Sequence, residues 1–197
     1  MYDSSFYKSA LNAKSWQTMI GSMIAKKYNI HSVIDLGCGI GAYLDGFESY
    51  GSIVKGIEFS YDSALPFIPD KIKNEISFGD MSKPLNIYDY TFDLSISIEV
   101  AEHIDEDKSE IFVSNLTKYS NKYILFSAAP PRGRVVGEGH VNEQPKEYWI
   151  EKIEANGFKY SKKDTLEIQE EINNMHVRSR YLSFLKFELM WFIKDTK

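Results

Sequence analysis

The sequence has one cysteine, no long apolar run and no linker rich in proline, glycine or serine. Cys38 lacks a partner for an intramolecular disulfide and a metal-ligand spacing, which favours a reducing, cytoplasmic environment. The N-terminal segment MYDSSFYKSALNAKSW has no basic region followed by an apolar run, so no secretory signal is expected. Residues 181–194 form the most apolar late stretch, but Lys186 and Glu188 interrupt it and it is too short to span a bilayer. We therefore expect a soluble protein without membrane insertion.

The charge balance is mildly acidic. A net charge of -5 and a pI near 5.4 provide no general attraction for a phosphate backbone or an anionic membrane surface. Nucleic acid is therefore not expected as a partner. A chain of 197 residues with 43% hydrophobic content can bury one substantial core, so residues 1–197 are expected to form a single domain.

Short apolar segments alternate with amphipathic segments from about residue 30 onward, which is typical of an α/β fold with a mostly parallel sheet. Segments rich in β-branched or aromatic residues are expected as strands at 31–36, 53–58, 75–78, 92–98 and 123–128. Their nearly continuous apolar character indicates burial on both faces of the sheet. Two later segments, 159–168 and 187–193, would complete a sheet of seven strands.

Amphipathic segments between these strands are expected as helices at 10–27, 42–49, 106–119 and 146–156, with a short turn after Ser60. Gly157 follows the last of them, where a C-cap glycine is common. Tyr148 and Trp149 open that helix and are interpreted as core residues rather than as a platform for a substrate.

A glycine-rich turn follows the first expected strand in the sequence VIDLGCGIG, residues 33–41. Glycine lets the backbone turn sharply and approach a ligand closely, because no Cβ is in the way. The alternative is a tight turn without a ligand. Glu58 favours a ligand, because it ends the next expected strand 23 residues after Asp35, close to the spacing at which a carboxylate meets ribose hydroxyls.

Asp35 distinguishes this loop from the dinucleotide-binding pattern G-x-G-x-x-G. A carboxylate just before the glycines would repel a pyrophosphate, whereas it would attract a ligand that carries an ammonium group.

Together these features resemble class I S-adenosylmethionine-dependent methyltransferases. VIDLGCGIGAYL resembles their first motif, Glu58 their ribose-binding acid, and Phe78-Gly79-Asp80-Met81 the acidic loop that contacts adenine. FDLSISIEVAEHI, residues 92–104, resembles the fourth motif beside the transferred methyl group. The resemblance implies a Rossmann-like seven-stranded sheet with an antiparallel last strand and helices on both faces.

The same resemblance implies where the cofactor S-adenosylmethionine binds. The expected cofactor-binding residues are Asp35, Gly37, Cys38, Gly39, Gly41, Glu58, Phe59, Asp80, Met81 and Glu99. Residues 1–29 are expected as an N-terminal helical lid segment that includes Tyr2, Phe6 and Tyr7, and residues 30–197 as the Rossmann-like core.

A narrower resemblance covers residues 125–158, which contain GHVNEQ and a Tyr-Trp pair. This segment is similar to a subgroup of bacterial methyltransferases associated with glycan and cell-surface biosynthesis genes, which implies a small-molecule acceptor such as a sugar or nucleotide sugar. The insert Arg132-Gly133-Arg134 departs from that pattern. Its two arginines would either clamp an acceptor phosphate or remain solvated loop charges.

Methyl transfer to a hydroxyl requires close positioning and removal of a proton, so the site needs a base or a metal. Glu99, Glu102, His103 and His140 are the best candidates for a metal site. If the chain turns helical after Ile98, the first three share one face. Oxygen and imidazole ligands suit Mg²⁺ or Mn²⁺, and Glu-x-x-Glu-His resembles the metal site of ubiquinone-pathway O-methyltransferases and of small-RNA terminal 2′-O-methyltransferases.

The alternative is a metal-free site, because the same pattern also occurs in methyltransferases not known to bind metal, where it shapes the cofactor pocket. The predicted catalytic residues are then His140 as general base, with Glu99 and His103 beside it. The leading function is O-methylation of a small-molecule or sugar-linked hydroxyl. The alternatives are a metal-dependent RNA terminal ribose 2′-O-methyltransferase and a catalytically silent cofactor-binding protein.

Overall fold

A seven-stranded sheet forms the centre of the protein in a computed structural model that describes residues 2–131, 139–175, 182, 185 and 187–196. The strand order is β3-β2-β1-β4-β5-β7-β6. The strands are β1 (Ser32–Leu36), β2 (Ile53–Glu58), β3 (Ile76–Phe78), β4 (Phe92–Ile98), β5 (Ser120–Ser127), β6 (Phe158–Tyr160) and β7 (Met190–Lys194). β1 to β5 pair in parallel, whereas β7 runs antiparallel to both β5 and β6. The expected α/β fold with a mostly parallel sheet and an antiparallel last strand is confirmed.

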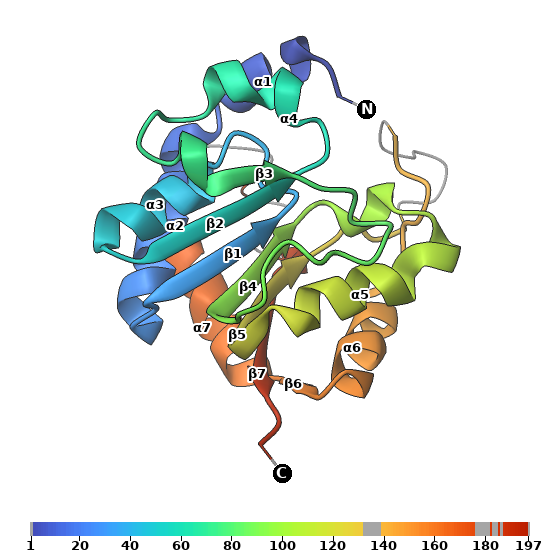
Figure 1. Cartoon of the computed structure of the whole chain (residues 1–197). Coiled ribbons are helices and arrows are strands. Elements are labelled where there is room, and N and C mark those ends of the chain that lie inside the picture. The colour runs from blue at the N-terminus through green and yellow to red at the C-terminus, as the bar shows by residue number, and fades with distance from the viewer. Residues whose placement is uncertain (1, 132–138, 176–181, 183–184, 186, 197) are drawn as a thin grey trace.

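Helices cover both faces of this sheet (Figure 1). α2, α3 and α7 lie against one face, and α5 and α6 lie against the other. The helices are α1 (Ser4–Ala10), α2 (Lys14–Tyr28), α3 (Ala42–Tyr50), α4 (Tyr61–Ala64), α5 (Ser109–Lys118), α6 (Lys146–Ala155) and α7 (Lys162–Asn173). Short 3-10 turns occur at Leu65–Phe67, Lys73–Glu75, Ala101–His103 and Glu106–Lys108.

The apolar strands separate two hydrophobic clusters, one on each face of the sheet. Ile20, Ile24 and Phe47 belong to the first cluster and are fully buried. In the second cluster Trp149 is 1% exposed, and its ring contacts that of Phe126 at a centroid distance of 5.4 Å. The core interpretation of Trp149 therefore agrees with the structure.

Two glycines allow α2 and α3 to pack closely. A Cβ on Gly21 would lie 2.3 Å from the carbonyl oxygen of Tyr43, and a Cβ on Gly46 would lie 2.1 Å from that of Thr18. Because carbon and oxygen cannot approach so closely, both positions require glycine. α2 is thereby fixed against the helix that follows the glycine-rich turn.

One of the expected elements is wrong, and another begins later than expected. The segment 159–168 is not one strand, because β6 ends at Tyr160 and α7 begins at Lys162. The Ser161 hydroxyl caps α7 by accepting from the Asp164 backbone, and the buried residues Thr165, Ile168 and Ile172 follow a helical spacing. The first expected helix, 10–27, is present as α2, which begins at Lys14, and only Ala10 of that range belongs to α1.

Within the described residues, the structure contains no helix with the length and apolar character needed to cross a membrane.

Candidate functional site

A cavity of about 960 Å³ opens at the carboxyl ends of β1, β2 and β4, the position at which open α/β sheets bind ligands. Its walls include most of the residues expected to bind the cofactor: Asp35, Gly37, Cys38, Gly39, Glu58, Phe59, Asp80, Met81 and Glu99. The expected lid residues Tyr2, Phe6 and Tyr7 line it as well. α1 lies beside α4 above this end of the sheet (Figure 1).

The glycine-rich turn exposes its backbone to the cavity. Gly37 and Gly39 have φ angles of 83° and 56°, in the region that favours glycine. A Cβ on Gly39 would meet no atom within 4 Å, so this glycine faces open space. Gly41 differs, because it does not line the cavity and its Cβ would lie 2.7 Å from Ile72. Its prediction as a cofactor-binding residue is therefore corrected to a packing position at the start of α3.

Glu58 lies at the end of β2, where backbone and side-chain donors hold its carboxylate. Oε2 accepts from the Gly39 backbone nitrogen at 2.8 Å, and Oε1 accepts from the Ser60 backbone nitrogen at 2.9 Å. The Tyr7 hydroxyl also donates to Oε1 at 2.9 Å. Because a carboxylate offers about four acceptor positions, Glu58 retains capacity for a further donor such as a ribose hydroxyl.

Asp35 is 2% exposed at the base of the cavity. Burial, followed by the nearby negative charge of Glu58, raises the pKa of the Asp35 carboxyl well above its usual range. A cation bound in the cavity would favour the charged form of Asp35. The position therefore fits the ammonium group of an amino-acid moiety better than it fits a phosphate.

The loop after β3 brings Asp80 and Met81 to the cavity as expected. Asp80 Oδ1 accepts from the Ser82 backbone nitrogen at 3.0 Å, and Oδ2 lies 2.9 Å from Lys83 Nζ. Despite partial burial, the bonds from Ser82 and Lys83 lower the pKa of Asp80. Phe59 lies nearby, with its ring centroid 6.0 Å from that of Phe78, so two aromatic rings flank this acidic loop.

Glu99 begins the segment that follows β4, and the condition that the chain turns helical after Ile98 is not met at Glu99 itself. Glu99 has a φ of 57°, outside the helical region, and only Ala101–His103 form a 3-10 turn. The Ser127 hydroxyl donates to Glu99 Oε1 at 2.7 Å. Glu99 therefore turns toward the cavity and β5, and does not share a helical face with Glu102 and His103.

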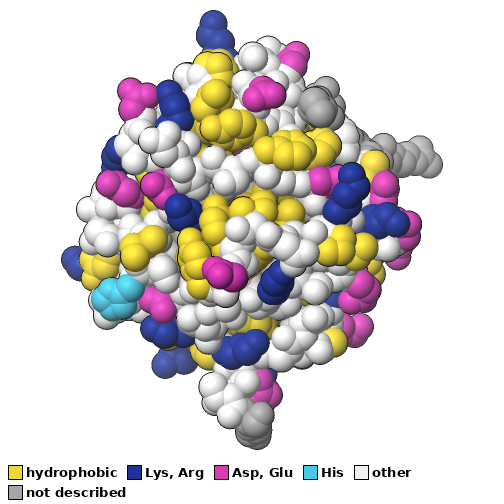
Figure 2. Space-filling view, viewed as in Figure 1, with side chains coloured by type: hydrophobic (Ala, Val, Ile, Leu, Met, Phe, Trp, Pro, Cys, Tyr) yellow, Lys and Arg dark blue, Asp and Glu magenta, His cyan; other side chains and the backbone are white. Residues whose placement is uncertain are grey.

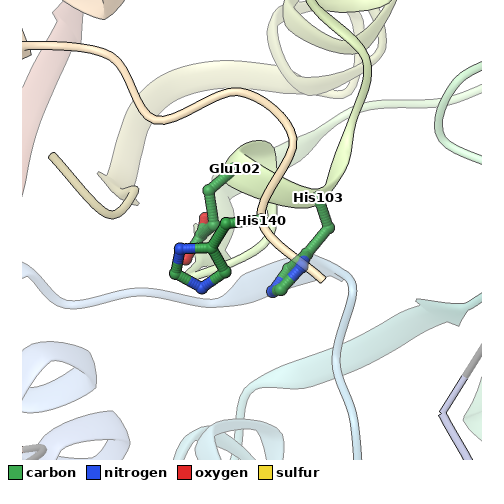
Figure 3. Close-up of side chains that lie close together, drawn as sticks. All are labelled: Glu102, His103 and His140. Atoms are coloured by element: carbon green, nitrogen blue, oxygen red, sulfur yellow. The ribbon is translucent and has the colours of Figure 1, made fainter. Parts of the chain in front are cut away.

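Three of the four residues predicted to bind metal gather in one place (Figure 3). Glu102, His103 and His140 each offer a ligand atom within 4.8 Å of the others. The two imidazole centroids are 4.8 Å apart at an interplanar angle of 82°. Glu99 lies outside this group, so its predicted place among the ligands is corrected.

Glu102 is the buried member of the group, with an exposed fraction of 1%. Its Oε2 has no hydrogen-bond partner among the described residues. Burial, followed by the charge of Glu99, raises the pKa of Glu102 to about 8. A buried oxygen without a partner normally costs free energy, so this atom fits a site that is completed by a cation or a donor.

Each of the two histidines has hydrogen-bond partners of its own. His103 Nδ1 lies 2.9 Å from the Gly139 carbonyl oxygen, and the Tyr2 hydroxyl lies 3.0 Å from His103 Nε2. Burial lowers the pKa of His103, which favours the neutral imidazole. Only the neutral form can bind a metal or accept a proton. His140 Nδ1 lies 2.7 Å from Glu143 Oε1. His103 lines the cavity, whereas His140 and Glu102 lie close to His103 but do not line it.

Sequence reasoning missed two parts of the site. Ser60 contributes a backbone donor to Glu58, and Glu143 bonds to His140. The signal for Glu143 was available, since it lies three residues after a candidate histidine within GHVNEQ. Arg132 and Arg134, considered as an acceptor clamp, lie outside the described residues.

Comparison with known proteins identifies a similar family and similar folds. Residues 34–117 match the family model of the methyltransferase domain. This stretch runs from β1 through α5 and contains the glycine-rich turn, Glu58, Asp80 and the Glu102-His103 pair. The match covers less than half of the chain, and the seven-stranded sheet has the Rossmann-like arrangement found in methyltransferase structures.

Solved structures with this fold share little sequence with the chain. Magnesium protoporphyrin IX methyltransferase from Synechocystis PCC 6803, with bound SAH, is 13% identical over 94% of this chain and 84% of that protein, with a TM-score of 0.65. An O-methyltransferase family protein from Burkholderia thailandensis is 12% identical over 96% of this chain and 58% of that protein, with a TM-score of 0.66.

An O-methyltransferase from a polyketide synthase multienzyme of Brevibacillus brevis, in complex with S-adenosyl-L-homocysteine, is 17% identical over 90% of this chain and 72% of that protein, with a TM-score of 0.57. No curated protein sequence matches the chain significantly. At these identities the structural comparisons establish the fold.

Proposed function

We propose that the protein is an S-adenosylmethionine-dependent methyltransferase that methylates a hydroxyl of a small molecule, with a sugar or a nucleotide sugar as the acceptor class. The observation that carries the proposal is the juxtaposition of a cavity lined by Asp35 and Glu58 with the group Glu102, His103 and His140. The first pair suits the cofactor, and the second group suits activation of a hydroxyl.

The residues of the cavity fit S-adenosylmethionine, which supplies an electrophilic methyl group when it is bound. Asp35 would hold the ammonium group, and Glu58 would accept from the ribose hydroxyls. The open space over Gly39 allows the ligand to approach the backbone. Solved structures of the same fold contain SAM or SAH, which supports this choice of ligand.

The acceptor side fits a divalent cation. Glu102, His103 and His140 would be its ligands, since one carboxylate and two imidazoles suit a hard or borderline metal such as Mg²⁺ or Mn²⁺. A bound ion of this kind lowers the pKa of an acceptor hydroxyl. The partnerless Oε2 of Glu102 supports this version. In the metal-free version, His140 Nε2 accepts the hydroxyl proton as general base.

The second candidate is a metal-dependent RNA terminal ribose 2′-O-methyltransferase, because the same three residues would also suit its metal site. Charge argues against it. On the face that Figure 2 shows, Lys and Arg side chains are interspersed with Asp and Glu side chains, and the net charge is -5. A protein that binds RNA through phosphate contacts usually concentrates basic side chains along one face.

Transfer of a radiolabelled methyl group from S-adenosylmethionine tests the proposal. The acceptor panel contains monosaccharides, nucleotide sugars and short RNAs, each with Mg²⁺, with Mn²⁺ or with EDTA. We expect label in a sugar-linked hydroxyl, and loss of transfer in EDTA. Transfer that persists in EDTA would select the general-base version, and label confined to RNA would select the second candidate.

Variants at Glu102 separate the metal from the cofactor. Glu102→Gln keeps the shape of the side chain and removes its charge, so metal-dependent transfer should fall about 10- to 100-fold while SAH binding is unchanged. Glu151→Gln, an exposed glutamate of α6, is the matched control. The proposed function would be contradicted if the protein did not bind SAH and no acceptor in the panel became labelled.

A further inference from the structure

The segment Gly139 to Gln144 is built onto the backbone of Glu102. The Glu102 carbonyl oxygen accepts from the backbone nitrogens of Val141 and Asn142 at 2.8 and 3.0 Å. Glu102 accepts both bonds through its backbone, and its side-chain carboxylate belongs to the candidate metal group. The segment and Glu102 are therefore held in a fixed register.

The Asn142 side chain anchors the same segment. Asn142 is 3% exposed, and its Nδ2 donates to the Ser109 hydroxyl at 3.0 Å at the start of α5. Its Oδ1 accepts from Gln144 Nε2, also at 3.0 Å. These buried polar bonds tie the segment to α5 as well as to Glu102, which limits its freedom to move.

Each imidazole of the group then finds an acceptor for its Nδ1 within this segment. The Gly139 carbonyl lies 2.9 Å from His103 Nδ1, and the Glu143 carboxylate lies 2.7 Å from His140 Nδ1. A carbonyl or a carboxylate oxygen can only accept, so each Nδ1 carries the proton. The Nε2 lone pair of His140 is thereby directed to a ligand or a proton, whereas that of His103 faces the Tyr2 hydroxyl at 3.0 Å.

Glu143 is well placed to hold His140. The side chains of His140 and Glu143 are 16% and 10% exposed, so water competes weakly for their bond. We propose that Glu143 is a positioning residue, which fixes the His140 tautomer and ring orientation so that Nε2 faces His103 and Glu102. The inference rests on the proposed function for its purpose, and serves both the metal version and the general-base version.

Long-range nitrogen–proton NMR of the histidine side chains tests the proposal directly. The chain has four histidines, so comparison with His140→Ala assigns the signals of His140. At about pH 8, above the ordinary histidine pKa of about 6.5, the wild-type ring should be protonated on Nδ1. Glu143→Ala should shift it toward the Nε2-protonated form that prevails in water, whereas Glu151→Ala should leave it unchanged.

Mn²⁺ titration provides the second readout, with an expected loss of affinity of about 10- to 100-fold in Glu143→Ala. If Glu143→Ala does not fold, Glu143→Gln replaces it, and the same changes are expected at smaller size because the amide retains an acceptor. The proposal would be overturned if His140 were protonated on Nε2 in the wild-type protein, or if Glu143→Ala left the His140 tautomer unchanged. A wild-type protein that binds neither Mn²⁺ nor SAH but shows the Nδ1 tautomer would contradict the proposed function alone.

Discussion

Asp35 and Glu58 are two buried carboxylates that face one cavity, yet their surroundings differ. Glu58 receives two backbone donors and the Tyr7 hydroxyl, whereas burial and the charge of Glu58 raise the pKa of Asp35. A raised carboxyl pKa means that folding favours the protonated form. The stability that Asp35 contributes is present below its unfolded pKa of about 3.9 and is lost as the pH rises through the folded value. Asp35 is therefore retained at a cost to the ligand-free protein.

Replacement of Asp35 by asparagine should separate stability from binding. At neutral pH the melting temperature of ligand-free Asp35→Asn should rise by about 2–4 °C, which corresponds to about 1 kcal/mol for a chain of this size. Its affinity for SAH should fall about 10- to 100-fold, because a bond between an ammonium and a carboxylate is lost. Thermal melts and calorimetry measure the two effects.

The exposed Asp62 of α4 provides the control, since Asp62→Asn removes the same charge away from the cavity. The control should change neither quantity. Asp35→Asn with unaltered SAH affinity would show that Asp35 does not contact the ligand.

At the scale of elements, α1 is a short helix whose attachment depends on few contacts. Tyr7 is its one buried residue, at 1% exposure, and its hydroxyl bonds to Glu58. Asp3 caps the helix by accepting from the backbone of Ser5 and Phe6. A helix of seven residues is not stable by itself, so α1 persists because Tyr7 packs into the wall of the cavity.

Tyr7→Ala should therefore release α1 while the sheet remains folded. Hydrogen exchange of the amides in 4–10 should accelerate at least about 10-fold, equivalent to about 1.4 kcal/mol, without change in β1 and β4. Leu11→Ala, which alters a residue 42% exposed, is the control. Equal protection of α1 in Tyr7→Ala and in the wild-type protein would contradict this account.

The sequence predicted the central strands well because their signal is local. Ile53–Glu58 and Phe92–Ile98 have the bounds that were expected, since each is an apolar run ended by a turn. Residues 162–168, the first part of α7, were predicted as strand, because the buried residues of α7 follow a helical period that is hidden among charged residues. Residue type and spacing do not reveal which face such a short stripe presents.

In the site, too, local sequence patterns predicted more than contacts between distant segments. Of the residues expected to bind the cofactor, all except Gly41 line one cavity, because the strand–turn–helix pattern places them together, whereas Gly41 packs on Ile72. The grouping of Glu102 with His140 was expected, but the left-handed backbone at Glu99 was not, and it removes Glu99 from the group. Tyr7 was expected only as part of a lid, because its bond to Glu58 joins segments 51 residues apart.

At the scale of the whole molecule, one edge of the sheet carries both the candidate cofactor-binding residues and the candidate metal group. The carboxyl ends of β1 and β2 present Asp35 and Glu58, and the segment after β4 presents Glu102 and His103. The loop before α6 adds His140 from a distant part of the chain. This arrangement would allow the proposed cofactor binding and hydroxyl activation to occur at adjacent places.

The central claim is that the cavity between Asp35 and Glu58 binds the methyl-donor cofactor, and calorimetric titration of S-adenosylhomocysteine into the purified protein tests it most directly. The account predicts a dissociation constant in the micromolar range, and a loss of about 10- to 100-fold in Glu58→Gln, which forfeits hydrogen bonds to a charged acceptor. Absence of binding to the wild-type protein at millimolar ligand, with or without Mg²⁺, would contradict the claim.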